Sequence, residues 1–174
     1  FAGFLMVEKF GYDAATITLL YLLNHVINMF LAPKIGKMIG KWGERRALVF
    51  EYAGLFIVFV SYAFVENHIL AGGLYVIDHL FFALAIAIKT YFQKIADPAD
   101  ISSTAGVSFT INHIAAVFIP AAFGLLWLIS PGAVFLAGAA MAFVSLVLAL
   151  NVPHDPEPGN EVLRGYKSTA AQPA

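Results

Sequence analysis

Two adjacent ionisable residues within an apolar stretch are the strongest candidates for chemistry in this sequence. Asp78 and His79 lie about ten residues into the stretch 69–92, whose other charged residue is Lys89. If this stretch crosses a membrane as a helix, both side chains lie near mid-bilayer, where an ionisable group is a functional candidate by default. A carboxylate beside an imidazole can bind and release a proton near neutral pH. We therefore interpret the pair as a proton-binding or substrate-binding site.

Further polar residues recur at helical spacing in two other apolar stretches. Asn24 and Asn28 are four residues apart, so on a helix they share a face. The alternative for such residues is hydrogen bonding that holds membrane helices together, and for Asp78 it is a hydrogen bond to a histidine of a neighbouring helix. The candidate substrate-binding or proton-binding set is Asp78, His79, His113, Asn112, Asn24, His25 and Asn28. The histidines lack metal-ligand spacing and the chain has no cysteine, so we expect no metal and no cofactor.

The elements that must position these residues follow from composition. The chain has 174 residues, 60% of them hydrophobic and 12% charged, about half the charged fraction of ~25% in soluble domains. Five stretches of at least 19 residues hold only Glu51, Asp78 and Lys89 as charges, and each matches the ~20 residues that cross a bilayer as a helix. The predicted spans are 14–33, 47–65, 69–92, 101–129 and 132–151, preceded by the end of another helix at 1–10. This pattern predicts an all-α polytopic membrane protein and argues against a soluble enzyme.

The distribution of basic residues predicts the orientation. Nine of the ten Lys and Arg residues fall on one side or snorkel toward it, and only Lys9 falls on the other. By the positive-inside rule, loops 34–46 and 93–100 and the C-terminus are cytoplasmic. The residues 152–174 are proline-rich and poor in large apolar side chains, which predicts a disordered cytoplasmic tail. We expect a multi-pass integral protein of the plasma (inner) membrane.

The spans differ in polarity. Stretches 14–33, 69–92 and 101–129 carry most of the polar residues and are expected to face protein or water, whereas 47–65 and 132–151 are expected to face lipid. Glu51, near the cytoplasmic end of its span, is interpreted as an interfacial charge that pairs with Arg45 or Arg46. Pro120 predicts a kink in 101–129, more as a packing feature than as a gating hinge.

The loop at residues 36–48 reads GKMIGKWGERRAL. Its glycines let helix ends approach and let the chain reverse tightly. This loop resembles the signature loop of the major facilitator superfamily, roughly G-x-x-x-D-R-x-G-R-R. The matching positions are Gly36, Lys41, Gly43, Arg45 and Arg46, while Gly40 and Glu44 stand where the family usually has Asp and often has Arg.

The resemblance implies that residues 1–151 form the C-terminal half of a major-facilitator-type helical bundle, made of the end of one helix plus five transmembrane helices. It implies a secondary active transporter that moves a small solute by alternating access and is proton-coupled. Its partners would be the solute, protons, the lipid bilayer and a missing N-terminal half of the same protein. The net charge of −1 argues against nucleic acid.

Two other classes of function stay open. One is a non-transporting membrane receptor or scaffold with a transporter-like fold. The other is an intramembrane enzyme, which we favour least because Ser108 lacks the glycine turn of a serine nucleophile. We expect that the protein is not an enzyme.

Overall fold

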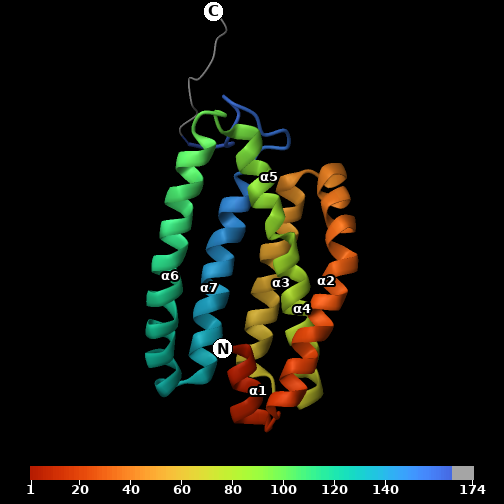
Figure 1. Cartoon of the computed structure of the whole chain (residues 1–174). Helices are drawn as coiled ribbons and strands as arrows, with labels where there is room; N and C mark the ends of the chain where they lie inside the picture. The colour runs from red at the N-terminus through yellow and green to blue at the C-terminus, as the bar shows by residue number, and fades with distance from the viewer. Residues whose placement is uncertain (166–174) are drawn as a thin grey trace, which may run out of the picture.

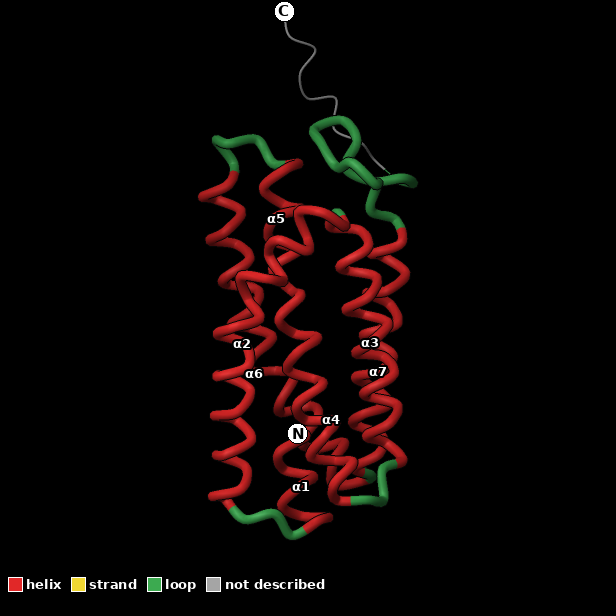
Figure 2. The backbone as a smooth tube through the Cα atoms, turned by 90° about the vertical axis from the view of Figure 1, so that its right-hand side faces the viewer, coloured by secondary structure: helices red, strands yellow, loops and turns green. Residues whose placement is uncertain are grey.

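The computed structural model describes residues 1–165, which fold into long helices lying side by side, with no strand among them (Figure 1). The elements in chain order are α1 (Ala2–Phe10), α2 (Ala14–Trp42), α3 (Glu44–Phe64), α4 (His68–Phe82), the 3₁₀ turn η1 (Ala83–Ala85), α5 (Ile86–Ile95), α6 (Ile101–Ile129) and α7 (Pro131–Leu150). The connections gather at the two ends of the bundle (Figure 2).

Five helical segments are long and apolar enough to cross a membrane. They are α2, α3, the continuous run from α4 through η1 to α5, α6 and α7, with lengths between 20 and 29 residues. The prediction of an all-helical protein is therefore confirmed for the described residues, and the five apolar helices are compatible with a multi-pass membrane protein. Ser130 caps α7 ahead of Pro131, whereas Asp100 precedes α6 without a side-chain capping bond.

The predicted loop 34–46 is almost entirely helical. α2 continues to Trp42 and α3 begins at Glu44, so Gly43 alone joins them, with φ 81° and ψ 155°. Positive φ is a conformation that glycine adopts without strain, in agreement with the predicted tight reversal at this residue. The helix extends beyond its apolar stretch because Ile35 and Ile39 are buried while the lysines of this segment point outward.

The run from α4 to α5 contains a change of helix type that no proline or glycine marks. Ala83–Ala85 form a 3₁₀ turn, five residues after Asp78. In contrast, α6 runs from Ile101 to Ile129 without interruption through Pro120. Mid-helix 3₁₀ turns often mark hinges, and this one lies close to Asp78 in the sequence.

The centre of the bundle is formed by α3, packed closely against α7 and also against α4. Phe59 covers Gly138, and the rings of Tyr62 and Phe135 stack 5.0 Å apart between centroids. The many Ala and Gly residues of α7 let α3 approach closely, as small residues do in membrane bundles. The stretches expected to face lipid thus supply the main contact within this chain.

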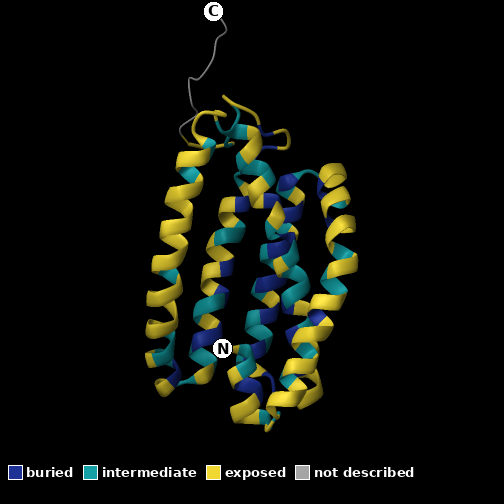
Figure 3. Cartoon of the chain, viewed as in Figure 1, coloured by how far each residue is buried: buried dark blue, intermediate teal, exposed yellow. Residues whose placement is uncertain are grey.

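The polar-rich helices α2 and α6 lie at the outside and are mostly exposed (Figure 3). Nothing in residues 1–165 covers the greater part of their surface, although their polar content predicts that they face protein or water.

The C-terminal residues differ from the expected disordered tail over 152–165. Val152 and Pro153 are buried, and Asn151 exchanges hydrogen bonds of 2.7 and 2.8 Å with the backbone of Arg164. The Tyr91 hydroxyl donates to the backbone oxygen of Glu161 at 2.6 Å. The composition is too polar to form a core alone, but the segment folds back onto helix ends that are already in place. The remaining tail residues, 166–174, lie outside the described part.

Candidate functional site

Buried polar atoms without hydrogen-bond partners occur on the three helices α2, α3 and α4. Asn24 is completely buried and both atoms of its amide lack a partner. Asp78 is 7% exposed and its Oδ1 has no partner. The Tyr62 hydroxyl and Asn28 Oδ1 also lack a hydrogen-bond partner. Each unsatisfied buried polar group costs roughly 1–3 kcal/mol of folding free energy, so a native structure keeps such groups where they serve a further purpose.

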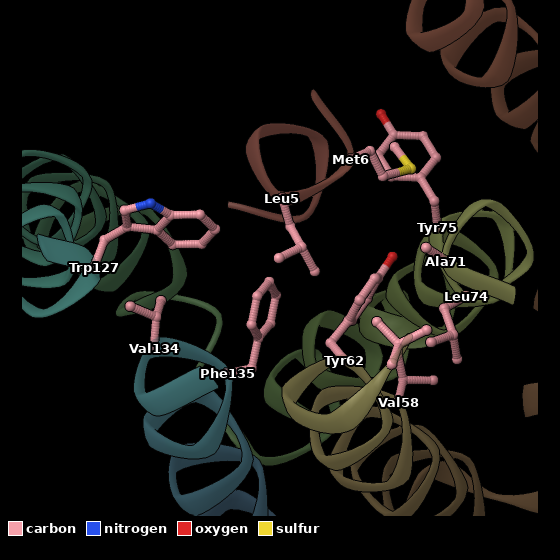
Figure 4. Close-up of a cluster of buried hydrophobic side chains, with 11 residues drawn as sticks. Leu5, Met6, Val58, Tyr62, Ala71, Leu74, Tyr75, Trp127, Val134 and Phe135 are labelled. Carbon is pink, nitrogen blue, oxygen red and sulfur yellow. The ribbon is translucent and has the colours of Figure 1, made fainter. Parts of the chain in front are cut away.

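Two tyrosines from different helices lie near Asp78. Tyr62 on α3 and Tyr75 on α4 both lie within electrostatic range of the Asp78 carboxyl group. Figure 4 shows the Tyr62 hydroxyl directed toward α4, which carries Tyr75. Tyr62 is 2% exposed and belongs to the core cluster that also contains Met6 and Phe135. Asp78 therefore lies at the edge of an apolar core that holds it in place.

Asp78 and His79 also line a cavity of about 400 Å³. That volume is within the range of small-molecule sites, roughly 300–1,000 Å³. Asp78 is the only acidic side chain in its wall and His79 the only imidazole. The rest of the wall is largely aromatic, with Phe59, Tyr75, Phe82, Phe123 and Phe135. The site can accept a proton or a cationic group at Asp78 and apolar or aromatic parts of a solute against the rings.

His79 is oriented by its own helix. Its Nδ1 lies 2.9 Å from the backbone oxygen of Tyr75. A carbonyl oxygen only accepts, so Nδ1 carries the hydrogen and Nε2 is left to accept a hydrogen bond or a second proton. His113 on α6 makes the same contact with the backbone oxygen of Phe109 at 2.9 Å.

The structure brings together only part of the predicted set. Asp78 and His79 share the cavity, and Asn24 and Asn28 point unpartnered atoms inward from α2. His25 is exposed and its ring packs 4.1 Å from that of Tyr21. Asn112 and His113 are exposed on α6 and do not line the cavity with Asp78.

The residues that resemble the signature loop lie on two helices rather than in a loop. Gly36 and Lys41 belong to α2, Gly43 makes the reversal, and Arg45 and Arg46 begin α3. Both arginines line a surface hollow with His154 from the C-terminal segment.

An ion pair at this end was not predicted. Lys94 Nζ lies 2.9 Å from a carboxylate oxygen of Glu44, whose side chain is 3% exposed. Glu44 is the first residue of α3 and lies within a basic segment of the sequence. This position is the only sequence signal that points to an ion pair at Glu44.

Glu51 differs from its predicted pairing with Arg45 or Arg46. It is 2% exposed, its Oε2 has no hydrogen-bond partner, and neither ion pair within residues 1–165 involves it. At 100° per residue, each arginine lies more than about 100° away from Glu51 around α3. The burial of Glu51 could have been predicted from helical spacing, because it shares one face of α3 with other buried residues. This inward stripe consists of Leu48, Glu51, Leu55, Val58 and Tyr62.

Comparison of the chain with protein-family models, with curated proteins and with solved structures gives no match. The major facilitator resemblance thus stays a prediction from the loop and the order of the helices. Among residues 1–165, no three His, Asp or Glu side chains gather closely enough to hold a metal ion.

Proposed function

We propose that the chain is part of a secondary active transporter that moves a small solute across the membrane by alternating access, coupled to protons. The observation that carries this proposal is Asp78, a buried carboxylate with an unpartnered oxygen in the wall of a cavity within five membrane-spanning segments. A carboxylate at such a depth is expensive to keep and is typical of proton and substrate pathways.

In the proposed cycle Asp78 exchanges a proton with the solute or binds the solute's cationic group, while the Nε2 of His79 supplies a second acceptor beside it. The aromatic wall of the cavity binds the apolar part of the solute. The 3₁₀ turn that follows α4 is the segment whose hydrogen bonding changes most easily, so it is the proposed hinge for opening the site to one side.

The exposed polar faces support a second half of the molecule. Asn112 and His113 on α6 and His25 on α2 have no cover within residues 1–165. In a major-facilitator-type bundle an N-terminal half would pack across these helices and complete a water-filled cavity. The proposal therefore assigns this chain the role of one half of the cavity wall.

The test uses the full-length protein in proteoliposomes that contain a pH-sensitive dye, with a panel of organic cations, neutral solutes and organic anions added outside. We expect at least one solute to drive proton movement in the parent, and Asp78→Asn to abolish it. Asp155→Asn, an exposed carboxylate of the C-terminal segment, is the matched control and should leave the flux unchanged. A parent in which no solute moves protons would favour the non-transporting receptor. An Asp78→Asn protein with the parent's flux and pH dependence would make Asp78 structural.

A further inference from the structure

Glu51 is a second buried carboxylate that the proposed cycle does not use. It lies on α3 in the inward stripe of buried residues, between Leu48 and Leu55. Its side chain is among the largest that are fully buried, and Oε2 has no partner. An unpaired carboxylate in an apolar interior is strongly disfavoured as an anion and becomes neutral by binding a proton.

Its position relative to Asp78 follows from one contact between α3 and α4. The ring of Phe81 lies directly against Gly54, in the space that a Cβ at residue 54 would occupy. Glu51 is three residues before Gly54, and Asp78 is three residues before Phe81.

The two helices run in opposite directions, so these steps lead to opposite sides of the contact (Figure 1). Glu51 lies toward the end of the bundle that holds Gly43, and Asp78 lies on the other side. With a rise of 1.5 Å per residue, the backbone positions of Glu51 and Asp78 are about 9 Å apart along the bundle axis. The Gly54–Phe81 contact is thus an apolar barrier between two unpartnered carboxylates.

The elements packed against α3 supply no counter-charge to Glu51. α7 and η1 contain no ionisable side chain. The ionisable residues of the other packed helices are Tyr21, His25, Lys34, Lys37 and Lys41 on α2, His68, Tyr75, Asp78 and His79 on α4, and Lys89, Tyr91 and Lys94 on α5.

Most of these residues are turned away or already engaged. Lys94 pairs with Glu44, and Tyr91 donates to the Glu161 backbone. The lysines of α2 and Lys89 are exposed, as are Tyr21, His25 and His68. On α3 itself, Arg45 and Arg46 line the surface hollow with His154, and Tyr52 is the adjacent titratable group. Asp78, with its companions Tyr62, Tyr75 and His79, lies beyond Phe81.

We infer that Glu51 is a second proton-binding site, placed on the cytoplasmic side of the Gly54–Phe81 contact. The carboxyl group holds one proton when the bundle is closed around it. It releases that proton to cytoplasmic water, leaving a carboxylate, when movement at the adjacent turn η1 admits water. The inference that Glu51 binds a proton depends only on the burial of its carboxyl group. The inference that this proton takes part in solute movement rests on the proposed function.

The first test reads the proton directly by infrared spectroscopy of the full-length protein in lipid bilayers, titrated from about pH 5 to about pH 8. We expect a carbonyl band of a protonated carboxylic acid at about pH 7 that is shifted by labelling glutamate with ¹³C. The band should disappear in Glu51→Gln and persist in Glu66→Gln, whose carboxylate is 82% exposed at the opposite end of the bundle.

Labelling in the parent protein keeps the test valid even if Glu51→Gln does not fold. Absence of any protonated glutamate at about pH 7 in the parent would overturn the inference. So would a band that persists in a folded Glu51→Gln protein.

The second test separates this inference from the proposed function. If a solute drives proton movement in the parent, Glu51→Gln should abolish it, and Glu66→Gln should retain it. A glutamate band without any solute-driven flux would keep the proton site and reject the transporter. Solute-driven flux that is unchanged in Glu51→Gln would keep the transporter and remove Glu51 from its cycle.

Discussion

The ring of Phe81 occupies the space that any side chain at residue 54 would need, so Gly54 sets how closely α3 and α4 approach. Along the bundle axis, Asp78 lies on one side of this contact and Glu51 on the other, each about one helical turn away. The contact also lies just before η1, so a movement of the turn would shift the ring between the two carboxylates. The close approach of Phe81 explains why residue 54 is a glycine, and the neighbouring residues in the sequence do not reveal this.

Substitution of Gly54 by Ala should therefore destabilise the bundle. The added methyl group must displace the Phe81 ring, and overpacking of this kind costs typically about 1–3 kcal/mol. Thermal unfolding of the purified protein in detergent measures the effect. Gly73→Ala on α4 is the control, because its Cβ would meet nothing within 4 Å. The double variant Gly54→Ala, Phe81→Ala should recover part of the loss, and a Gly54→Ala protein as stable as the parent would mean that the helices are not this close.

The Glu44–Lys94 pair predicts an asymmetric result. Lys94→Met leaves the buried Glu44 carboxylate without its partner, whereas Glu44→Gln together with Lys94→Met removes both charges. Because the Lys94 side chain is 52% exposed, water reduces the loss, and we expect Lys94→Met to cost on the order of 1 kcal/mol. The double variant should be more stable than Lys94→Met in chemical unfolding. Equal stability of the double variant and Lys94→Met would show that the Glu44–Lys94 pair contributes nothing to the free energy of unfolding.

Acid should weaken the start of α2. Asp13 caps this helix, and hydrogen bonds from the Thr16 side chain and backbone N–H lower the pKa of its carboxyl group below the ordinary value of 3.8. A lowered pKa in the folded state stabilises it above the ordinary pKa, and this stabilisation is lost as the pH falls through the lowered value. Protection of the first turn of α2 against hydrogen exchange, taken relative to the intrinsic exchange rate at each pH, should therefore fall in acid. Asp13→Asn should show a weaker pH dependence, and identical profiles would contradict the role of the cap.

Orientation can be tested directly because the chain has no cysteine of its own. Single cysteines at Lys41 and at His68, both exposed at opposite ends of the bundle, should react from opposite sides of the membrane. The excess of basic residues predicts that Lys41 is on the cytoplasmic side. Reaction of Lys41→Cys with an impermeant thiol reagent in intact cells would contradict the predicted orientation.

Water access to α6 distinguishes a cavity face from a lipid face. Asn112 on α6 and Val144 on α7 are both exposed within this chain, so burial does not separate them. In the full-length protein we expect Asn112→Cys to react with a water-soluble thiol reagent and Val144→Cys to remain unreactive in the bilayer. Similar rates at both positions would argue against a water-filled cavity along α6.

The spans were predictable from the sequence because crossing a bilayer is a local demand on about twenty consecutive residues. The reversal at Gly43 follows from the same kind of local rule, as does the capping of α7 by Ser130. What surrounds each side chain could not be predicted in this way. The helix α2 runs past the predicted end of its span, where Ile39 finds apolar cover on other helices, and Val152 in the predicted tail is buried in the same cluster.

The tertiary structure alone decided which carboxylates have partners. Glu44 and Glu51 lie seven residues apart on one helix and both are nearly fully buried, yet Glu44 meets Lys94 and Glu51 meets no cation in residues 1–165. Hydrophobicity is a property that a residue carries with it, whereas a charge is neutralised only by what the fold brings within a few ångströms. That partner comes from a helix about fifty residues away, and its distance depends on how the helices pack.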